Sequence, residues 1–205
     1  MKVIQAFGSS SHTGKLRIVL CDINPEMTSA WLANFASLED VEILQGDLME
    51  TETDAIVSPA NSFGDMGGGL DKRIDDYFGG AAQKAVMENI RVRFLGECPV
   101  GMAFITQLAI PRPVFLIAAP TMRIPGGVAG THNAYLAMRA VLVAVTKYNE
   151  RATDKIGTIA VPGLCTGVGG MTCQESAMQM RAAYDNIIRR EWKKIVHPAM
   201  APFPF

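Results

Sequence analysis

The chain alternates short apolar runs with stretches in which apolar residues recur every three or four positions. The short runs are typical of buried strands, and the longer spacing is typical of helices that cover one face of a sheet. The pattern predicts strands at residues 16–21, 41–45, 55–59, 102–105, 114–119 and 156–161, and helices from Asn24 to about residue 38 and over residues 81–94, 133–149 and 172–190.

Two of these helices carry signals for an N-terminus. Asn24 can cap a helix and Pro25 suits its first turn. Thr172 and Glu175 have the spacing of a capping box. Because strands alternate with helices, the fold class is α/β, a three-layer α/β/α domain with a mixed, largely parallel central sheet. The strand at residues 114–119 is apolar on both faces, so we expect it to be central.

A chain of 205 residues predicts one domain, residues 1–205, rather than two. The recognisable core spans about residues 16–190. Residues 1–15 are expected to form an N-terminal extension or an edge strand. Residues 197–205 are rich in proline and are expected to form an irregular tail.

Composition excludes several classes of function. A hydrophobic fraction of 49% with 19% charged residues is globular, and no apolar run reaches the roughly 18 residues that cross a bilayer. The first residues lack the apolar region of a signal peptide, so we expect a cytoplasmic protein. A net charge of −1 lacks the basic footprint of a duplex nucleic-acid binder. Backbone N–H groups can still hold a small anion.

Metal and nucleotidase sites are not indicated. The four cysteines form no C-x-x-C pair and the three histidines lie far apart, so we expect no metal and no cofactor. A P-loop at residues 8–15 is excluded, because five residues separate its glycines and Leu16 replaces the Ser or Thr that binds magnesium. The pair Lys72 and Arg73 is interpreted as a solvated helix face.

Two loops that follow predicted strands are rich in glycine. Residues 61–71 contain four glycines in eleven positions, and residues 162–171 lead into the capped last helix. Ligands of α/β sheets bind beyond the carboxyl ends of strands. Successive N–H groups beside a helix N-terminus attract anions, so two facing loops of this kind suit a pyrophosphate. Simple tight turns are the alternative.

Four segments, in this order, resemble the macro domain family over about residues 16–190: 46–48 (GDL), 54–61 (DAIVSPAN), 67–71 (GGGLD) and 162–170 (PGLCTGVGG). The resemblance implies a macro domain that binds ADP-ribose or a related nucleotide, with ADP-ribosylated protein as a further partner. It also implies hydrolysis at the distal ribose, as a mono-ADP-ribosyl hydrolase or an ADP-ribose 1″-phosphate phosphatase. A non-catalytic module that reads or sequesters ADP-ribose is the alternative.

The resemblance assigns roles to individual residues. It implies that Asp47 accepts a hydrogen bond from the adenine amino group, that the Leu48 backbone N–H reaches a ring nitrogen, and that Asn61 binds hydroxyls of the distal ribose. A turn or cap aspartate is the alternative for Asp47, and an Asx-turn is the alternative for Asn61. The residues expected to line the rest of the ligand site are Gly67, Gly68, Gly69, Leu70, Cys165, Thr166, Gly167, Val168 and Gly169.

Asp71 and Asn61 are the catalytic candidates. In hydrolytic macro domains an aspartate at the position of Asp71 orients or activates water at the anomeric carbon, a role worth about 10²–10⁴-fold in rate. The alternative is that Asp71 is the N-cap of a helix that ends at Tyr77. Cys165 is interpreted as a small packing residue rather than a nucleophile, because no base is identifiable near it.

The chain departs from the family pattern at the distal ribose. Gly169 stands where the family usually has an aromatic residue, so we expect a wider or differently shaped pocket there, with Phe63 or Arg123 as candidates to compensate. The aromatic residue that stacks on adenine is not identified, since Phe203 and Phe205 lie in the tail.

Overall fold

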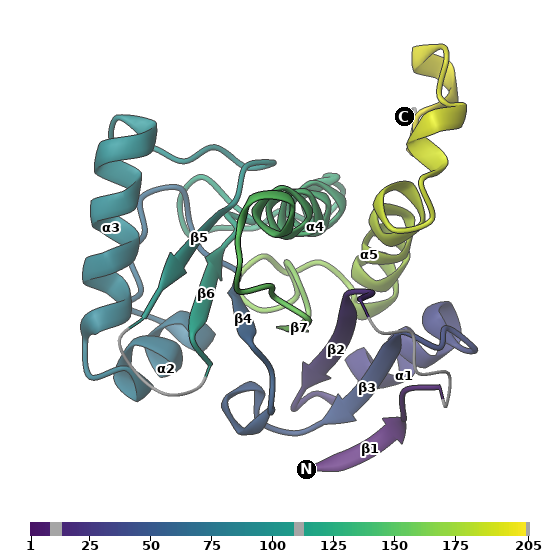
Figure 1. The fold of residues 1–205 in the computed structure, drawn as a ribbon, viewed down its shortest axis with the longest axis horizontal. Coiled ribbons are helices and arrows are strands. Elements are labelled where there is room, and N and C mark those ends of the chain that lie inside the picture. Colours follow the sequence, from purple (N-terminus) through teal and green to yellow (C-terminus); the bar gives the residue numbers. More distant parts are fainter. Residues whose placement is uncertain (9–13, 109–112, 204–205) are drawn as a thin grey trace.

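The computed structural model describes residues 1–8, 14–108 and 113–203, and within these ranges a seven-stranded sheet lies between two layers of helices (Figure 1). The strands are β1 (Lys2–Gln5), β2 (Arg17–Asp22), β3 (Val41–Gln45), β4 (Ala55–Ser58), β5 (Phe104–Gln107), β6 (Phe115–Ala118) and β7 (Thr158–Val161). The helices are α1 (Pro25–Phe35), α2 (Gly69–Tyr77), α3 (Ala81–Phe94), α4 (Asn133–Arg151) and α5 (Cys173–Ile187), with 3₁₀ turns η1 (Leu48–Glu50), η2 (Glu191–Lys194) and η3 (Pro198–Met200).

The strands lie in the order β1-β3-β2-β7-β4-β6-β5. The five inner strands are parallel, whereas β1 and β5 pair antiparallel at the two edges. The predicted α/β/α fold with a mixed, largely parallel sheet is therefore confirmed. Within the described residues 1–8, Lys2–Gln5 form the edge strand β1. The expectation that residues 114–119 are central is wrong, because β6 lies one strand from the edge.

The residues of β6 are all buried because helices cover both faces of the sheet. Phe115 and Ile117 belong to the core that contains α1, α4 and α5, whereas Leu116 and Ala118 belong to the core that contains α2 and α3. Successive side chains of a strand point to opposite faces. An apolar run with no alternation therefore indicates two covered faces, not a central position.

The starts of α1 and α5 agree with the sequence signals, and both helices end a few residues earlier than predicted. The Asn24 side chain accepts a hydrogen bond from the Glu26 N–H at 2.9 Å, and α1 ends at Phe35. Thr172 accepts from the Glu175 N–H at 3.2 Å, which is one half of a capping box. The last helix stops at Ile187 because the chain turns soon afterwards, with Arg190 at φ 61°.

The described part of the C-terminal tail packs against the domain. Its segment after α5, yellow in Figure 1, contains η2 and η3. The Phe203 ring stacks on the His132 ring, with centroids 5.3 Å apart. Residues 197–203 are irregular apart from the short turn η3, and contacts of Phe203 with the start of α4 hold the end of this segment. Phe205 lies outside the described residues.

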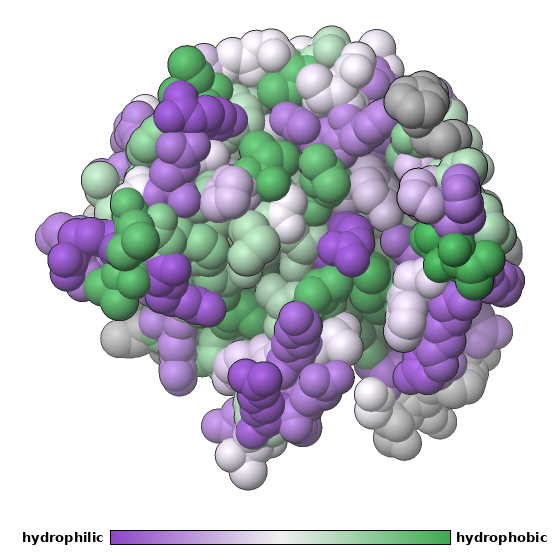
Figure 2. Space-filling model, turned by 90° about the horizontal axis from the view of Figure 1, so that it is seen from above, coloured by the Kyte–Doolittle hydropathy of each residue, from purple (hydrophilic) through white to green (hydrophobic). Residues whose placement is uncertain are grey.

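The surface mixes polar and apolar residues. In Figure 2 hydrophobic and weakly polar residues cover much of the middle of the face, with hydrophilic side chains around them. Among the helices in the described ranges, none is long and apolar enough to cross a membrane.

Candidate functional site

The predicted ligand-binding residues follow three of the parallel strands, of which β7 and β4 are neighbours and β3 is separated from β7 by β2. Asp47 and Leu48 follow β3, the first glycine loop follows β4, and the second follows β7. Parallel strands have their carboxyl ends at the same edge of the sheet. Because β4 pairs with β7, the two glycine loops leave from adjacent strands.

Asn61 organises the first glycine loop. Its Oδ1 accepts from the N–H groups of Phe63 at 3.0 Å and Asp65 at 3.3 Å, and its Nδ2 donates to the Asp65 carbonyl at 2.7 Å. The side chain is 7% exposed. The Asx-turn alternative is thus observed, and contact with a ribose remains a prediction.

The same loop is anchored to α3. Gly64 has φ +75°, and a Cβ there would lie 2.8 Å from Val86 and 2.9 Å from Ile90. The Met66 N–H donates to the Gln83 side chain at 2.8 Å. Glycine is therefore required at this turn, and the loop enters α2 along a defined path.

The glycine run ends at the N-terminus of α2. Gly68 is the N-cap, and the Lys72 N–H donates to the Gly68 carbonyl at 3.2 Å. The N–H groups of residues 69–71 precede this bond and have no partner within the helix. They point along the helix axis toward the loop, where a helix N-terminus favours an anion.

Asp71 lies in the first turn of α2 and is not its N-cap, so that alternative is wrong. Its side chain is buried, with the residue 9% exposed, and Oδ1 accepts from the Ser58 hydroxyl at 2.6 Å. Burial raises the pKa of Asp71 to about 6, the Ser58 hydrogen bond opposes this rise, and the charge of Asp65 adds to it. A buried carboxyl with such a pKa is a frequent feature of functional sites.

The second glycine loop closes on itself and exposes its tip. The Met171 N–H donates to the Cys165 carbonyl at 3.0 Å, and the Gly170 N–H donates to the Gly167 carbonyl at 3.0 Å. Cys165 takes a left-handed conformation with φ 67°. Gly167 and Val168 are exposed at the tip. The tip of the loop therefore presents the backbone of Gly167 together with the Val168 side chain, which is 65% exposed.

The expectation of a wider pocket at Gly169 is wrong. Gly169 is buried, and a Cβ there would lie 2.4 Å from the Cys165 carbonyl oxygen and 2.8 Å from Val128. The Val128 N–H also donates to the Gly169 carbonyl at 2.7 Å. The segment before α4 thus fills the space, and glycine is needed for this close approach.

Asp47 caps η1 and also forms an ion pair. It accepts from the Met49 N–H at 3.0 Å and from Arg73 Nε at 3.2 Å, and it pairs with Arg73 Nη2. The cap alternative is therefore observed, and the interpretation of Arg73 as a solvated side chain is incomplete. The hydrogen bond from Arg73 holds the pKa of Asp47 below its usual range, so the group is an ionised acceptor. Leu48 is buried beside it.

Phe63 and Arg123 lie together. The Arg123 guanidinium is 5.4 Å from the centre of the Phe63 ring and forms two hydrogen bonds with Glu97, at 2.7 and 3.0 Å. The Ser62 N–H donates to the Arg123 carbonyl at 3.1 Å. Sequence reasoning named the first two residues and missed Glu97, because no local pattern links positions 26 residues apart.

The cysteine and histidine side chains show no nucleophile or metal site in the described ranges. Cys165 is 3% exposed, and burial raises its pKa to about 12, which keeps the thiol neutral. Within residues 1–8, 14–108 and 113–203, no group of three or more His, Cys, Asp or Glu side chains is arranged to hold a metal ion. His12 lies outside these ranges. Phe203 was considered for the aromatic residue that stacks on adenine. It contacts α4, which follows β6, whereas Asp47, the residue expected to bind adenine, follows β3. Strands β2, β7 and β4 lie between β3 and β6.

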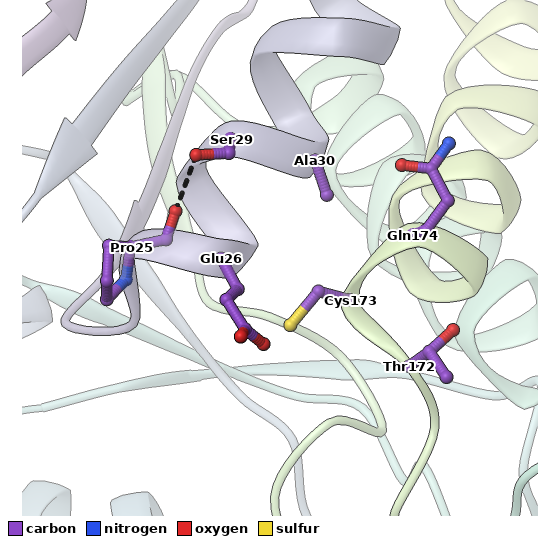
Figure 3. A pocket seen from close by; sticks show the side chains of 7 residues that line it. All are labelled: Pro25, Glu26, Ser29, Ala30, Thr172, Cys173 and Gln174. Atoms are coloured by element: carbon purple, nitrogen blue, oxygen red, sulfur yellow. Dashed lines mark hydrogen bonds between the residues drawn. The ribbon is translucent and has the colours of Figure 1, made fainter.

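Two cavities lie among these elements, and sequence reasoning found neither. A cavity of about 600 Å³ separates the starts of α1 and α5 (Figure 3), where the side chains of Glu26 and Cys173 extend toward the gap. A second cavity of about 370 Å³ lies between η1 and α2, and its lining includes Met49, Gly69 and Arg73. Each joins segments that are separated in the sequence.

Comparison with known proteins supports the family resemblance. The family model described as Macro domain matches residues 57–180. A macro domain-containing protein of Caldanaerobacter subterraneus is 31% identical over 139 residues, which are 68% of this chain and 75% of that protein. An Oceanobacillus iheyensis macrodomain variant solved with ADPR is 25% identical, with a TM-score of 0.57 over 67% of this chain and 72% of the other. Thermosipho africanus DarTG in complex with ADP-ribose is 16% identical, with a TM-score of 0.59 over 73% of this chain and 38% of the other.

Proposed function

The chain belongs to the macro domain family, and from this membership we propose that it binds ADP-ribose or a related ADP-ribosyl nucleotide and hydrolyses a bond at the distal ribose. ADP-ribosylated protein and ADP-ribose 1″-phosphate are the two substrate classes. Solved relatives in complex with ADP-ribose support the binding half of the proposal.

The observation that carries the hydrolytic half is the environment of Asp71. The carboxyl is buried in the first turn of α2, directly after the glycine run, and the Ser58 hydroxyl fixes one of its oxygens at 2.6 Å. With a pKa of about 6, the group is mostly ionised at neutral pH and is a stronger base than an exposed aspartate. This combination suits a general base.

The proposed ligand follows the carboxyl edge of the sheet. The adenine amino group donates to Asp47, and the two phosphates accept from backbone N–H groups of the glycine loops. In the hydrolytic step Asp71 takes a proton from water, the water oxygen bonds to the anomeric carbon, and the bond from that carbon to the leaving group breaks. Asn61 holds the loop beside the distal ribose, because its side chain bonds to the backbone of Phe63 and Asp65.

The test is a turnover assay on a mono-ADP-ribosylated protein and on ADP-ribose 1″-phosphate. We expect the wild type to release ADP-ribose, and Asp71→Asn to reduce the rate by about 10²–10⁴-fold because the base is lost. Asp76→Asn is the matched control, an exposed carboxylate of the same helix paired with Lys72. Wild-type protein that leaves both substrates unchanged would exclude hydrolysis of these substrates.

A binding module without turnover is the second candidate. It is favoured by the contacts of Asn61, whose Oδ1 and Nδ2 both bond to the backbone of the first glycine loop, and by the bond from Ser58 to Oδ1 of Asp71. Calorimetric titration with ADP-ribose separates the two candidates when combined with the turnover assay: heat without turnover identifies a reader. Absence of both heat and thermal stabilisation would refute ADP-ribose binding.

A further inference from the structure

We propose that Arg73 is a positioning residue that sets the base specificity of the site, by holding Asp47 with one acceptor position open toward the nucleobase. This inference rests on the proposed function, in which Asp47 receives the adenine amino group.

The hydrogen bonds of Asp47 define the open position. A carboxylate offers about four acceptor positions, two on each oxygen. Oδ1 accepts from the Met49 N–H at 3.0 Å and from Arg73 Nε at 3.2 Å, and Oδ2 pairs with Arg73 Nη2. Among the residues that the structure describes, three positions are thus used, and the fourth is on Oδ2. A ligand can therefore place one donor against this carboxylate.

The elements that carry the pair hold this geometry. Asp47 is the N-cap of η1, so its backbone and Oδ1 are held by the turn that follows. Arg73 lies four residues after Gly69 on α2, and residues at this spacing share one face of a helix. The planar guanidinium binds both carboxylate oxygens and prevents rotation of the carboxyl group, which a lysine cannot do.

The same helix connects the pair to the predicted phosphate site. The cavity of about 370 Å³ is lined by Gly69 at the start of α2, by Arg73 one turn later and by Met49 of η1. Gly69 belongs to the glycine run expected to hold phosphates, whereas Arg73 contacts the carboxylate expected to read the base. Helix α2 therefore sets the distance between the two halves of the nucleotide site.

The preference for adenine over hypoxanthine follows from the negative charge of Asp47 and from the single open acceptor position on its Oδ2. Adenine presents an amino group that donates to Oδ2, whereas hypoxanthine presents a carbonyl oxygen that Oδ2 repels. The pair also keeps Asp47 ionised in mildly acidic solution, because the hydrogen bond from Arg73 lowers its pKa. Glu50 on η1 and Cys21 on β2 also interact electrostatically with the pair, and burial raises the pKa of Cys21 to about 12, so that this thiol stays neutral. On α2, the titratable groups Lys72, Asp76 and Tyr77 line the same cavity as Arg73.

The experiment measures dissociation constants of ADP-ribose and inosine diphosphate ribose by calorimetry from about pH 3.5 to pH 7.5, a range that includes the ordinary pKa of an aspartate. We expect Arg73→Gln to weaken ADP-ribose binding about two- to fivefold, the range of an exposed ion pair, and to reduce the preference for adenine. As the pH is lowered, this variant is expected to lose ADP-ribose binding at a higher pH than the wild type does, because the pKa of Asp47 returns toward its ordinary value. Arg73→Lys keeps the charge and loses the two-point contact, so it lowers the base preference.

Arg91→Gln is the matched control, because Arg91 is an exposed arginine on α3 that pairs with Glu88 and does not line this cavity. It is expected to bind both nucleotides as the wild type does. Arg73→Gln with wild-type affinity, base preference and pH profile would overturn the inference, as would tighter binding of ADP-ribose by this variant, which would show that Arg73 blocks the base. A wild type that binds neither nucleotide overturns the proposed function itself.

Discussion

The charge of Asp71 makes a specific prediction about stability. Burial raises the pKa of this carboxyl from 3.8 to about 6, so the folded protein holds its proton more tightly than the unfolded chain does. The resulting stabilisation is complete below the unfolded pKa and is lost as pH rises through about 6. A shift of about two pKa units corresponds to about 3 kcal/mol. At neutral pH the protein therefore carries a buried charge that destabilises it.

Asp71→Asn removes this charge and keeps an oxygen that can accept from Ser58. Any constant effect of the amide is independent of pH and cancels when two pH values are compared. Relative to wild type, we expect the unfolding free energy of the variant to increase by about 2 kcal/mol between about pH 4 and pH 8, the part of the total that falls in this window. The substitution that removes the proposed catalytic base is therefore expected to raise the unfolding free energy relative to wild type as the pH becomes neutral.

Urea denaturation at several pH values measures this difference, with the slopes compared to verify that each transition is two-state. Asp76→Asn serves as the control, since the exposed Asp76 on the same helix is expected to show no such trend. Stability curves of Asp71→Asn and wild type that run parallel from acid to neutral pH would refute the reasoning from burial.

Further variants test the loop packing and the tuning of the carboxyl group. Gly169→Ala is expected to lower the unfolding free energy by about 1–3 kcal/mol, because its Cβ would lie 2.4 Å from a carbonyl oxygen, whereas Gly167→Ala has no atom within 4 Å and should be tolerated. Thermal unfolding of the two variants checks this, and equal melting temperatures would contradict it. Ser58→Ala removes a hydrogen bond that lowers the pKa of Asp71, so the acid limb of the hydrolysis rate should move to higher pH. Asp65→Asn removes a charge that raises it, so the limb should move to lower pH. Shifts in the same direction would contradict this assignment.

Local sequence patterns predicted the elements well and their ends less well. The strand at residues 41–45 and the helix at residues 81–94 have the predicted bounds. Elsewhere the shifts are a few residues, because hydrophobic spacing continues past the point where the backbone turns, as it does before Arg190. The position of β6 in the sheet was not predictable, since an apolar strand indicates two covered faces and says nothing about its neighbours.

Local features of the sequence were enough for three conclusions. The alternation of strands and helices indicated the α/β class, the glycine runs placed both loops after strands, and the order of the motifs indicated the family. Only the tertiary structure decided what surrounds the functional candidates. It pairs Asp47 with Arg73, buries Asp71 against Ser58 and packs Val128 against Gly169. These contacts join residues far apart in the chain, and the pKa of a carboxyl depends on the burial and charges around it rather than on its sequence neighbours. The chemistry of the site is therefore a property of the packed fold.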